Sequence, residues 1–153
     1  MNKITGMNKV ATMNHMNWSE IDKSNCWLST LYELYDNRVL FITDTRYANG
    51  SKVDCKQAVT ISEDDYNKLV EYLDKIKDSI FDMVGCDGDA WEVEIYKDNQ
   101  VDKHIKAGYI YINELFKTGI VKLLEKYDSI SGWLEETPWS HRKNSLKMKD
   151  THS

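Results

Sequence analysis

Residues 62 to 80 carry the pattern that most constrains the fold, because their apolar side chains recur with the period of a helix. Ser62 is followed by three acidic residues, which is the composition of a capped helix N-terminus. We expect an amphipathic helix here, with its apolar stripe against a sheet. The stripe consists of Tyr66, Leu69, Val70, Leu73, Ile76 and Ile80.

Three segments before this helix have the alternation and aromatic content of β-strands. Residues 27–35 and 38–47 are separated by Asp36-Asn37, and Asn49-Gly50 precedes a third run at residues 53–61. Asp, Asn and Gly tolerate the positive φ angles that tight hairpin turns require. The sequence therefore predicts three consecutive antiparallel strands.

After the helix, the acidic, glycine-containing turn at residues 85–89 leads into a second group of elements. Trp91, Val93 and Ile95 alternate with polar residues, which predicts a strand at residues 90–97. A polar loop then joins it to a further strand at residues 101–111. Apolar residues recur at helical spacing between positions 112 and 127, and residues 129–136 suit a last helical turn.

This order, β-β-β-α-β-β-α, predicts an α+β fold: an antiparallel sheet of about five strands with helices packed on one face. The length of 153 residues suits one domain. We expect that domain at residues 18–139. Residues 1–17, rich in Met and Asn, are predicted to be a flexible leader, and residues 140–153 a flexible basic tail.

Charge and composition exclude several classes of function. A net charge of −5 and a pI near 5.4 argue against direct nucleic-acid binding. No run of about 18 apolar residues is present, so no membrane partner is expected. Three cysteines without a C-x-x-C pair indicate neither a disulfide framework nor a zinc module, which favours a cytoplasmic location.

Asp87-Gly88-Asp89 with Glu92 and Glu94 supplies several carboxylate oxygens, which are the ligands that hard cations bind. A strand follows this turn where a calcium loop would need further ligands and a helix. We therefore interpret it as an acidic turn, and expect neither a metal nor another cofactor.

Nucleophilic catalysis would need a cysteine beside a histidine, and the candidates are Cys55 or Cys86 with His104. No surrounding motif marks an activated thiolate, and no phosphate-binding glycine loop is present. We expect a protein that is not an enzyme, with an undetected Cys/His enzyme as an alternative.

Residues 63–98 contain twelve acidic and four basic residues, and the chain has five Trp and nine Tyr. These features favour a small non-enzymatic cytosolic binding protein, such as an immunity protein or an inhibitor encoded by a phage or mobile element. It would dock an acidic, aromatic-bearing face on a protein partner with a basic surface. The predicted docking residues are Asp74, Asp78, Asp87, Asp89, Glu92 and Glu94.

The second hypothesis is a small-ligand binder or sponge for a nucleotide-like signal, in which aromatic rings stack on a base and basic side chains hold phosphate. Its binding residues would be Arg46, Lys103, Lys106 and Tyr109. The sequence leaves homo-oligomerisation open under either hypothesis.

Overall fold

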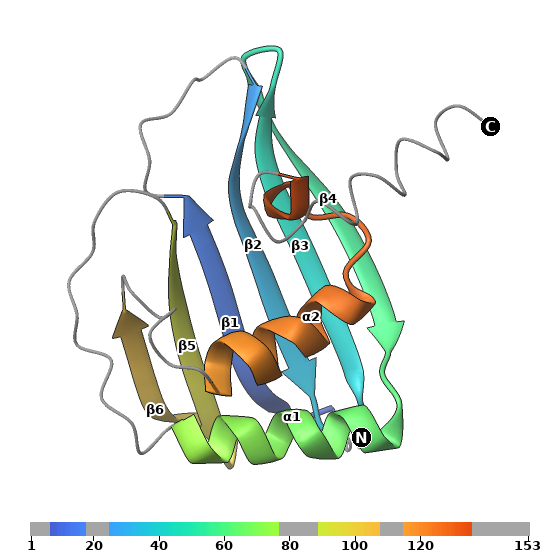
Figure 1. Ribbon diagram of the computed structural model, residues 1–153, viewed down its shortest axis with the longest axis vertical. Coiled ribbons are helices and arrows are strands. Elements are labelled where there is room, and N and C mark those ends of the chain that lie inside the picture. The colour runs from blue at the N-terminus through green and yellow to red at the C-terminus, as the bar shows by residue number, and fades with distance from the viewer. Residues whose placement is uncertain (1–6, 18–24, 77–88, 108–114, 136–153) are drawn as a thin grey trace.

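A computed structural model describes residues 7–17, 25–76, 89–107 and 115–135 (Figure 1). These residues form, in order, β1 (Lys9–Asn17), β2 (Asn25–Tyr35), β3 (Val39–Ala48), β4 (Ser51–Thr60), α1 (Glu63–Ile76), β5 (Asp89–Lys97), β6 (Gln100–Ala107), the π-helical turn η2 (Phe116–Ile120), α2 (Val121–Tyr127) and the 3-10 turn η3 (Gly132–Glu135).

The strands form one antiparallel sheet in the order β4-β3-β2-β1-β5-β6, which confirms the α+β prediction. The described part of the sheet has six strands, where the sequence predicted about five. The additional strand is β1, which pairs with both β2 and β5.

The expectation of a flexible leader at residues 1–17 is therefore wrong for residues 9–17. Ala11 and Met13 are fully buried there, and Thr12 and Asn14 alternate with them on the opposite face. The strand has few aliphatic residues, and its two partners lie far along the chain, so its local composition gave no indication of it. Residues 1–6, and the predicted tail at residues 140–153, lie outside the described residues.

The predicted hairpins occur at or near their expected positions. Asn49 and Gly50 have φ angles of 55° and 81°, and Asp98 and Asn99 have angles of 54° and 64°, as a two-residue turn with two positive φ angles requires. In the β2–β3 hairpin the positive φ angle occurs at Arg38, one residue after the predicted Asp36-Asn37 turn. The loop is thus one residue longer than predicted.

Helix α1 begins as predicted, because the Ser62 side chain accepts a hydrogen bond from the Asp65 amide at 3.1 Å. Its residues Leu69, Leu73 and Ile76 are buried in the core. Both α1 and α2 lie on the same side of the sheet (Figure 1). We call this side the helix face, and the opposite side the open face.

The helix face is built from cross-strand rows of side chains. One row joins Asp44, Thr30, His15 and Trp91 on β3, β2, β1 and β5, and all four are buried. Along each of these strands, the side chains that alternate with the buried ones point to the open face and are half-buried or exposed. Strand register places these open-face residues in two further rows: Ala58, Phe41, Glu33, Thr12, Glu94 and His104; and Lys56, Thr43, Leu31, Asn14 and Glu92.

Candidate functional site

A buried aromatic cluster fills the centre of the helix face. The His15 ring stacks on Trp91 with 4.1 Å between ring centroids, and meets the edges of Trp27 and Trp133, each at 4.7 Å. All four residues are at most 4% exposed. Trp91 therefore has the core position that its alternation predicts, and the cluster's role is to hold β1, β2, β5 and η3 together.

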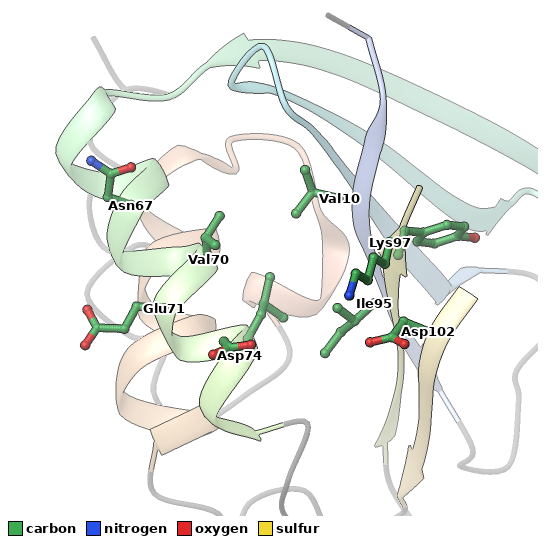
Figure 2. Close-up of a pocket in the computed structure, with 10 residues that line it drawn as sticks. Val10, Asn67, Val70, Glu71, Asp74, Ile95, Lys97 and Asp102 are labelled. Atoms are coloured by element: carbon green, nitrogen blue, oxygen red, sulfur yellow. The ribbon is translucent and has the colours of Figure 1, made fainter. Parts of the chain in front are cut away.

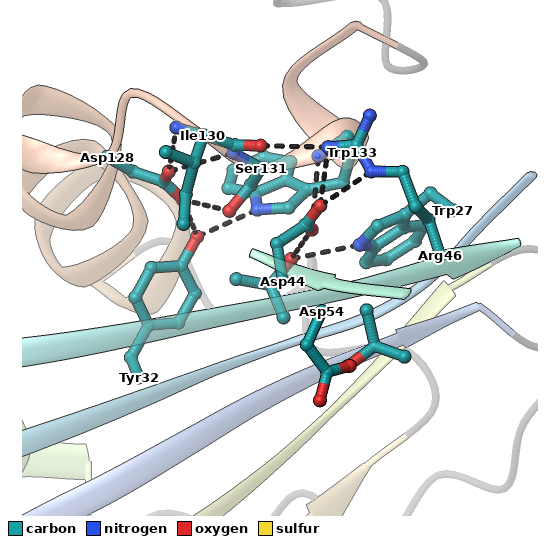
Figure 3. A network of polar contacts seen from close by, with 12 residues as sticks. Trp27, Tyr32, Asp44, Arg46, Asp54, Asp128, Ile130, Ser131 and Trp133 are labelled. Atoms are coloured by element: carbon teal, nitrogen blue, oxygen red, sulfur yellow. Dashed lines mark hydrogen bonds and ion pairs between the residues drawn. The ribbon is translucent and has the colours of Figure 1, made fainter. Parts of the chain in front are cut away.

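Beside this cluster, Asp44 is the acceptor of a buried polar network (Figure 3). It accepts hydrogen bonds from the Thr30 hydroxyl at 2.8 Å and the Gly132 amide at 3.1 Å, and it forms an ion pair with Arg46. Burial raises the pKa of Asp44, although the bonds from Arg46 and Thr30 oppose that shift. Arg46 also donates to the Ile130 carbonyl at 2.9 Å, so the network fixes the segment after α2 on the sheet.

Tyr32 and Asp128 form the second half of the network (Figure 3). The Tyr32 hydroxyl donates to Asp128 at 2.5 Å and accepts from the Trp133 indole at 2.7 Å. The other Asp128 oxygen accepts from the amides of Ile130 and Ser131, both at 3.0 Å. Burial raises the pKa of Tyr32 well above its usual value, which keeps the hydroxyl protonated. These groups pair with one another, as buried polar groups in a structural network do.

A groove of about 420 Å³ lies between α1 and the strands β1, β5 and β6 (Figure 2). Its apolar lining includes Val10, Val70 and Ile95. The charged residues that line it are Glu71, Asp74, Lys97 and Asp102. Asp74, one of the predicted docking residues, is therefore part of this groove.

The open face carries a second polar cluster, formed around Lys9. The Lys9 ammonium lies 3.3 Å from a Glu33 oxygen and above the rings of Tyr35 and Tyr96, at 5.9 and 5.5 Å from their centroids. The Tyr96 hydroxyl donates to Glu94 at 3.1 Å. We call Lys9, Glu33, Tyr35, Glu94 and Tyr96 the open-face cluster.

The electrostatics of this cluster follow from its geometry. Partial burial would lower the pKa of Lys9, but its hydrogen bond to Glu33 and its nearness to Tyr35 outweigh that effect and raise it. Burial and the bond to Glu94 raise the pKa of Tyr96. At neutral pH the cluster therefore holds an ammonium group and protonated Tyr96 beside two glutamates.

The predicted acidic docking residues divide between two faces of the molecule. Glu92 and Glu94 lie on the open face, and Glu92 contacts His104 on β6 at 2.5 Å. Asp74 lies on α1, on the helix side of the sheet. Asp89 begins β5, but its side chain lies outside what the structure describes, as do Asp78 and Asp87 altogether.

The residues of the ligand-binding hypothesis are also separated. The Arg46 guanidinium is engaged by Asp44 and the Ile130 carbonyl. Lys103 pairs with Ile95 in the register of β6, and Lys106 pairs with Glu92. Tyr109 and the side chain of Lys106 lie outside the described residues.

The structure excludes one of the two Cys/His pairs, the pair of Cys55 with His104. Cys55 is on β4 and His104 is on β6, at opposite edges of a six-stranded sheet, so these two cannot form a catalytic pair. Cys86, with the rest of the proposed metal turn at residues 85–88, lies outside the described residues. Within the described ranges, no three His, Cys, Asp or Glu side chains gather as metal ligands would.

Sequence reasoning missed Lys9, Glu33, Tyr35 and Tyr96 as members of one site. Lys9 fell in the segment interpreted as a leader, and the other three lie on strands whose neighbours were not known. Alternation within β2 does not say which strand Glu33 faces, and only the register brings it beside Thr12 of β1.

A scan against models of protein families finds no match for this chain, and a search of curated proteins finds no significant relative. In the part of the chain that the structure describes, no helix is both long and apolar enough to cross a membrane.

Proposed function

We propose that this chain is a small non-enzymatic binding protein that docks its open face on a basic segment of another protein. The mode of action would be that of an immunity protein or an inhibitor of the kind that phages and mobile elements encode. The proposed setting is the reducing cytoplasm, in keeping with Cys26 and Cys55, neither of which forms a disulfide.

The observation that carries this proposal is the charge on the three central strands β2, β1 and β5. Their open-face side chains include Glu33, Glu92 and Glu94, against the single base Lys9 among the described positions. Tyr35, Phe41 and Tyr96 lie among them, with the Tyr35 and Phe41 rings in edge contact at 5.5 Å. Such acidic surfaces with aromatic anchors favour basic partners.

The surroundings of Lys9 also indicate which kind of partner side chain the open face could bind. Its ammonium contacts a carboxylate and two aromatic rings, which are the groups that bind Lys and Arg side chains at protein interfaces. A hollow of about 550 Å³ lies beside it, lined by Tyr35, Phe41, Thr43 and Lys56 among others. A partner's basic side chain would fit against Glu33 there, with its aliphatic stem on the rings.

The test is reversal of the face charges. The variant E33K/E92K/E94K should lose the protein that the wild-type chain captures from a lysate of its host cells. A matched control, E63K/E71K/D74K, changes the same charge on α1 and should retain that protein. The captured protein is then purified and titrated against all three chains.

We expect wild-type binding to weaken as salt concentration rises, because the surface charges are screened. Equal affinity of the face variant and the wild type for the purified partner would overturn the proposal. So would loss of binding in the α1 control alone. Circular dichroism of each variant checks that the fold is retained.

The groove between α1 and β5 favours a second candidate function, binding of a small ligand. Its volume suits a small molecule, and it is lined by three acidic residues and one lysine around an apolar interior. This lining favours an organic cation over the nucleotide-like ligand that Arg46 and Lys103 were expected to hold. A rise in melting temperature with spermidine and none with nucleotides would support it, and the reverse result would contradict it.

A further inference from the structure

Strand β4 is an edge strand suited to pairing with another strand. It pairs with β3 over ten consecutive positions without a register shift, and its side chains from Ser51 to Lys56 are all exposed. The pairing at the other edge, between β5 and β6, contains a register shift at Ile95 and Tyr96. Long edge strands without a bulge are the ones that add a further strand.

The β3–β4 turn determines which backbone groups of β4 point outward. Asn49 and Gly50 both have positive φ angles, and in a two-residue hairpin of this kind the closing pair, Ala48 and Ser51, is hydrogen-bonded. From this pair onward, hydrogen-bonded and non-hydrogen-bonded residue pairs alternate along β3 and β4, so every second residue of β4 directs its backbone groups away from β3. The outward N–H and C=O groups therefore belong to Lys52, Asp54, Lys56 and Ala58.

We propose that a second copy of this chain pairs antiparallel with β4, with Cys55 opposite the partner's Cys55. In this register Asp54 lies opposite the partner's Lys56, and two-fold symmetry repeats the pair. Both residues present outward backbone groups, so each pair also exchanges hydrogen bonds, while Cys55 occupies a non-hydrogen-bonded position. The overlap runs from Ser51 to Val59.

Other symmetric registers are poorer. Centring the pairing on Asp54 places it opposite the partner's Asp54 and places Lys52 opposite the partner's Lys56. Centring it on Lys56 places two lysines together. Registers centred on Val53 or Gln57 avoid these repulsions but shorten the overlap. Opposite charges facing each other across an antiparallel pair stabilise it, and like charges destabilise it.

The resulting dimer would have one continuous sheet through both copies. Opposing residues of an antiparallel pair lie on the same side, so the two open faces would form a single surface. The dimer does not depend on the proposed function, because the open-face cluster lies on β1, β2 and β5; the hollow beside that cluster shares Lys56 with the dimer edge.

Sedimentation equilibrium of the full chain tests the proposal through the charge pairs. We expect a dimer for the wild type, and dissociation constants about tenfold higher or more for D54K and for K56D. An equimolar mixture of D54K and K56D should dimerise again. In the mixed dimer the two lysines of the D54K chain, at positions 54 and 56, face the two aspartates of the K56D chain. The control K52D should dimerise as the wild type does, because Lys52 faces the partner's Ala58.

Asp54 accepts a hydrogen bond from Thr45 at 2.8 Å within one copy, so D54K also changes the monomer. K56D leaves that bond intact and is the decisive single variant, with circular dichroism as the check on folding. A wild type that is monomeric at every concentration would overturn the proposal. So would a K56D variant that dimerises as tightly as the wild type.

Cys55 provides a test of the register. Non-hydrogen-bonded residues face each other with Cα atoms about 4.5 Å apart, within the range of a disulfide. Mild copper-catalysed oxidation should therefore cross-link the wild-type dimer, but not C55S, which retains Cys26 and Cys86. A stable wild-type dimer that gives no Cys55 cross-link would overturn the register.

Discussion

Asp44 is the residue at which the sheet and the C-terminal segment are joined. It is fully buried, and its partners come from β2, β3 and the turn at Gly132. The pKa of Asp44 is raised by burial despite the Arg46 contact, so the fold tolerates the charge only because its donors are in place. Removing the carboxylate takes this acceptor away from the Thr30 hydroxyl and the Gly132 amide, and takes from Arg46 the anion of its ion pair.

We predict that Asp44→Ala lowers the free energy of unfolding by about 3 kcal/mol, because the buried Thr30 hydroxyl and Gly132 amide lose their acceptor while the partly exposed Arg46 remains hydrated. Urea denaturation followed by tryptophan fluorescence measures this change. The control is Asp54→Ala, an exposed aspartate with one hydroxyl donor, for which we expect a loss of about 1 kcal/mol or less. Equal losses for the two variants would show that the buried network contributes little.

At the scale of elements, Asp65 joins the N-terminus of α1 to the C-terminus of α2. It accepts hydrogen bonds from Lys126 at 2.7 Å and from the Tyr127 hydroxyl at 2.5 Å. These contacts, led by the Lys126 bond, hold the pKa of Asp65 below its ordinary value. The folded state therefore favours the ionised carboxylate.

We predict that this contact stabilises the protein at neutral pH and is lost in acid. Because the folded pKa lies below the ordinary value of 3.8, the contribution is complete above that value and disappears as pH falls through the folded pKa. Asp65→Asn should cost about 1–2 kcal/mol at pH 7, and less as the pH approaches 3.

Denaturation midpoints measured across pH check this prediction. Asp64→Asn, at an exposed neighbouring position, serves as the control and should change stability by about 0.5 kcal/mol or less at every pH. A difference between wild type and Asp65→Asn that stays constant down to pH 3 would contradict the assignment.

The elements that sequence could predict are those whose signals are local. Helix α1 has its cap at Ser62 and its stripe within one segment, and the Asn49-Gly50 turn is set by two adjacent residues. Each of these depends on residues that are neighbours in the chain.

The open-face cluster could be predicted only in part. Glu92 and Glu94 were expected on an exposed parity of a strand, but their neighbours depend on which strand pairs with β5. Register brings Lys9 between Tyr35 and Tyr96, two residues that are far apart in the sequence. No local pattern specifies such a contact, and the same holds for the pairing of Asp44 with Gly132.

At the scale of the whole molecule, β1 is the strand that connects the two parts of the sheet. It is the only described strand between the unit β2-β3-β4 and the hairpin β5-β6, and it pairs with β2 and β5 over nearly its full length. Its residues Ala11, Met13 and His15 are buried on the helix face and form part of the core. Without β1, both units would expose the strand edges that now pair with it.

We predict that a chain lacking residues 1–17 does not fold cooperatively, because the loss of β1 leaves two small sheets without a shared core. Its amide spectrum should lack the dispersion of the full chain, and its thermal transition should be absent. Adding a synthetic peptide of residues 7–17 should restore both, since the peptide can occupy the gap between β2 and β5. A peptide with Ala11 and Met13 replaced by Asp is the control and should not restore them, because it would bury two charges. If the shortened chain unfolds with the cooperativity and midpoint of the full chain, the central position of β1 is not needed for stability.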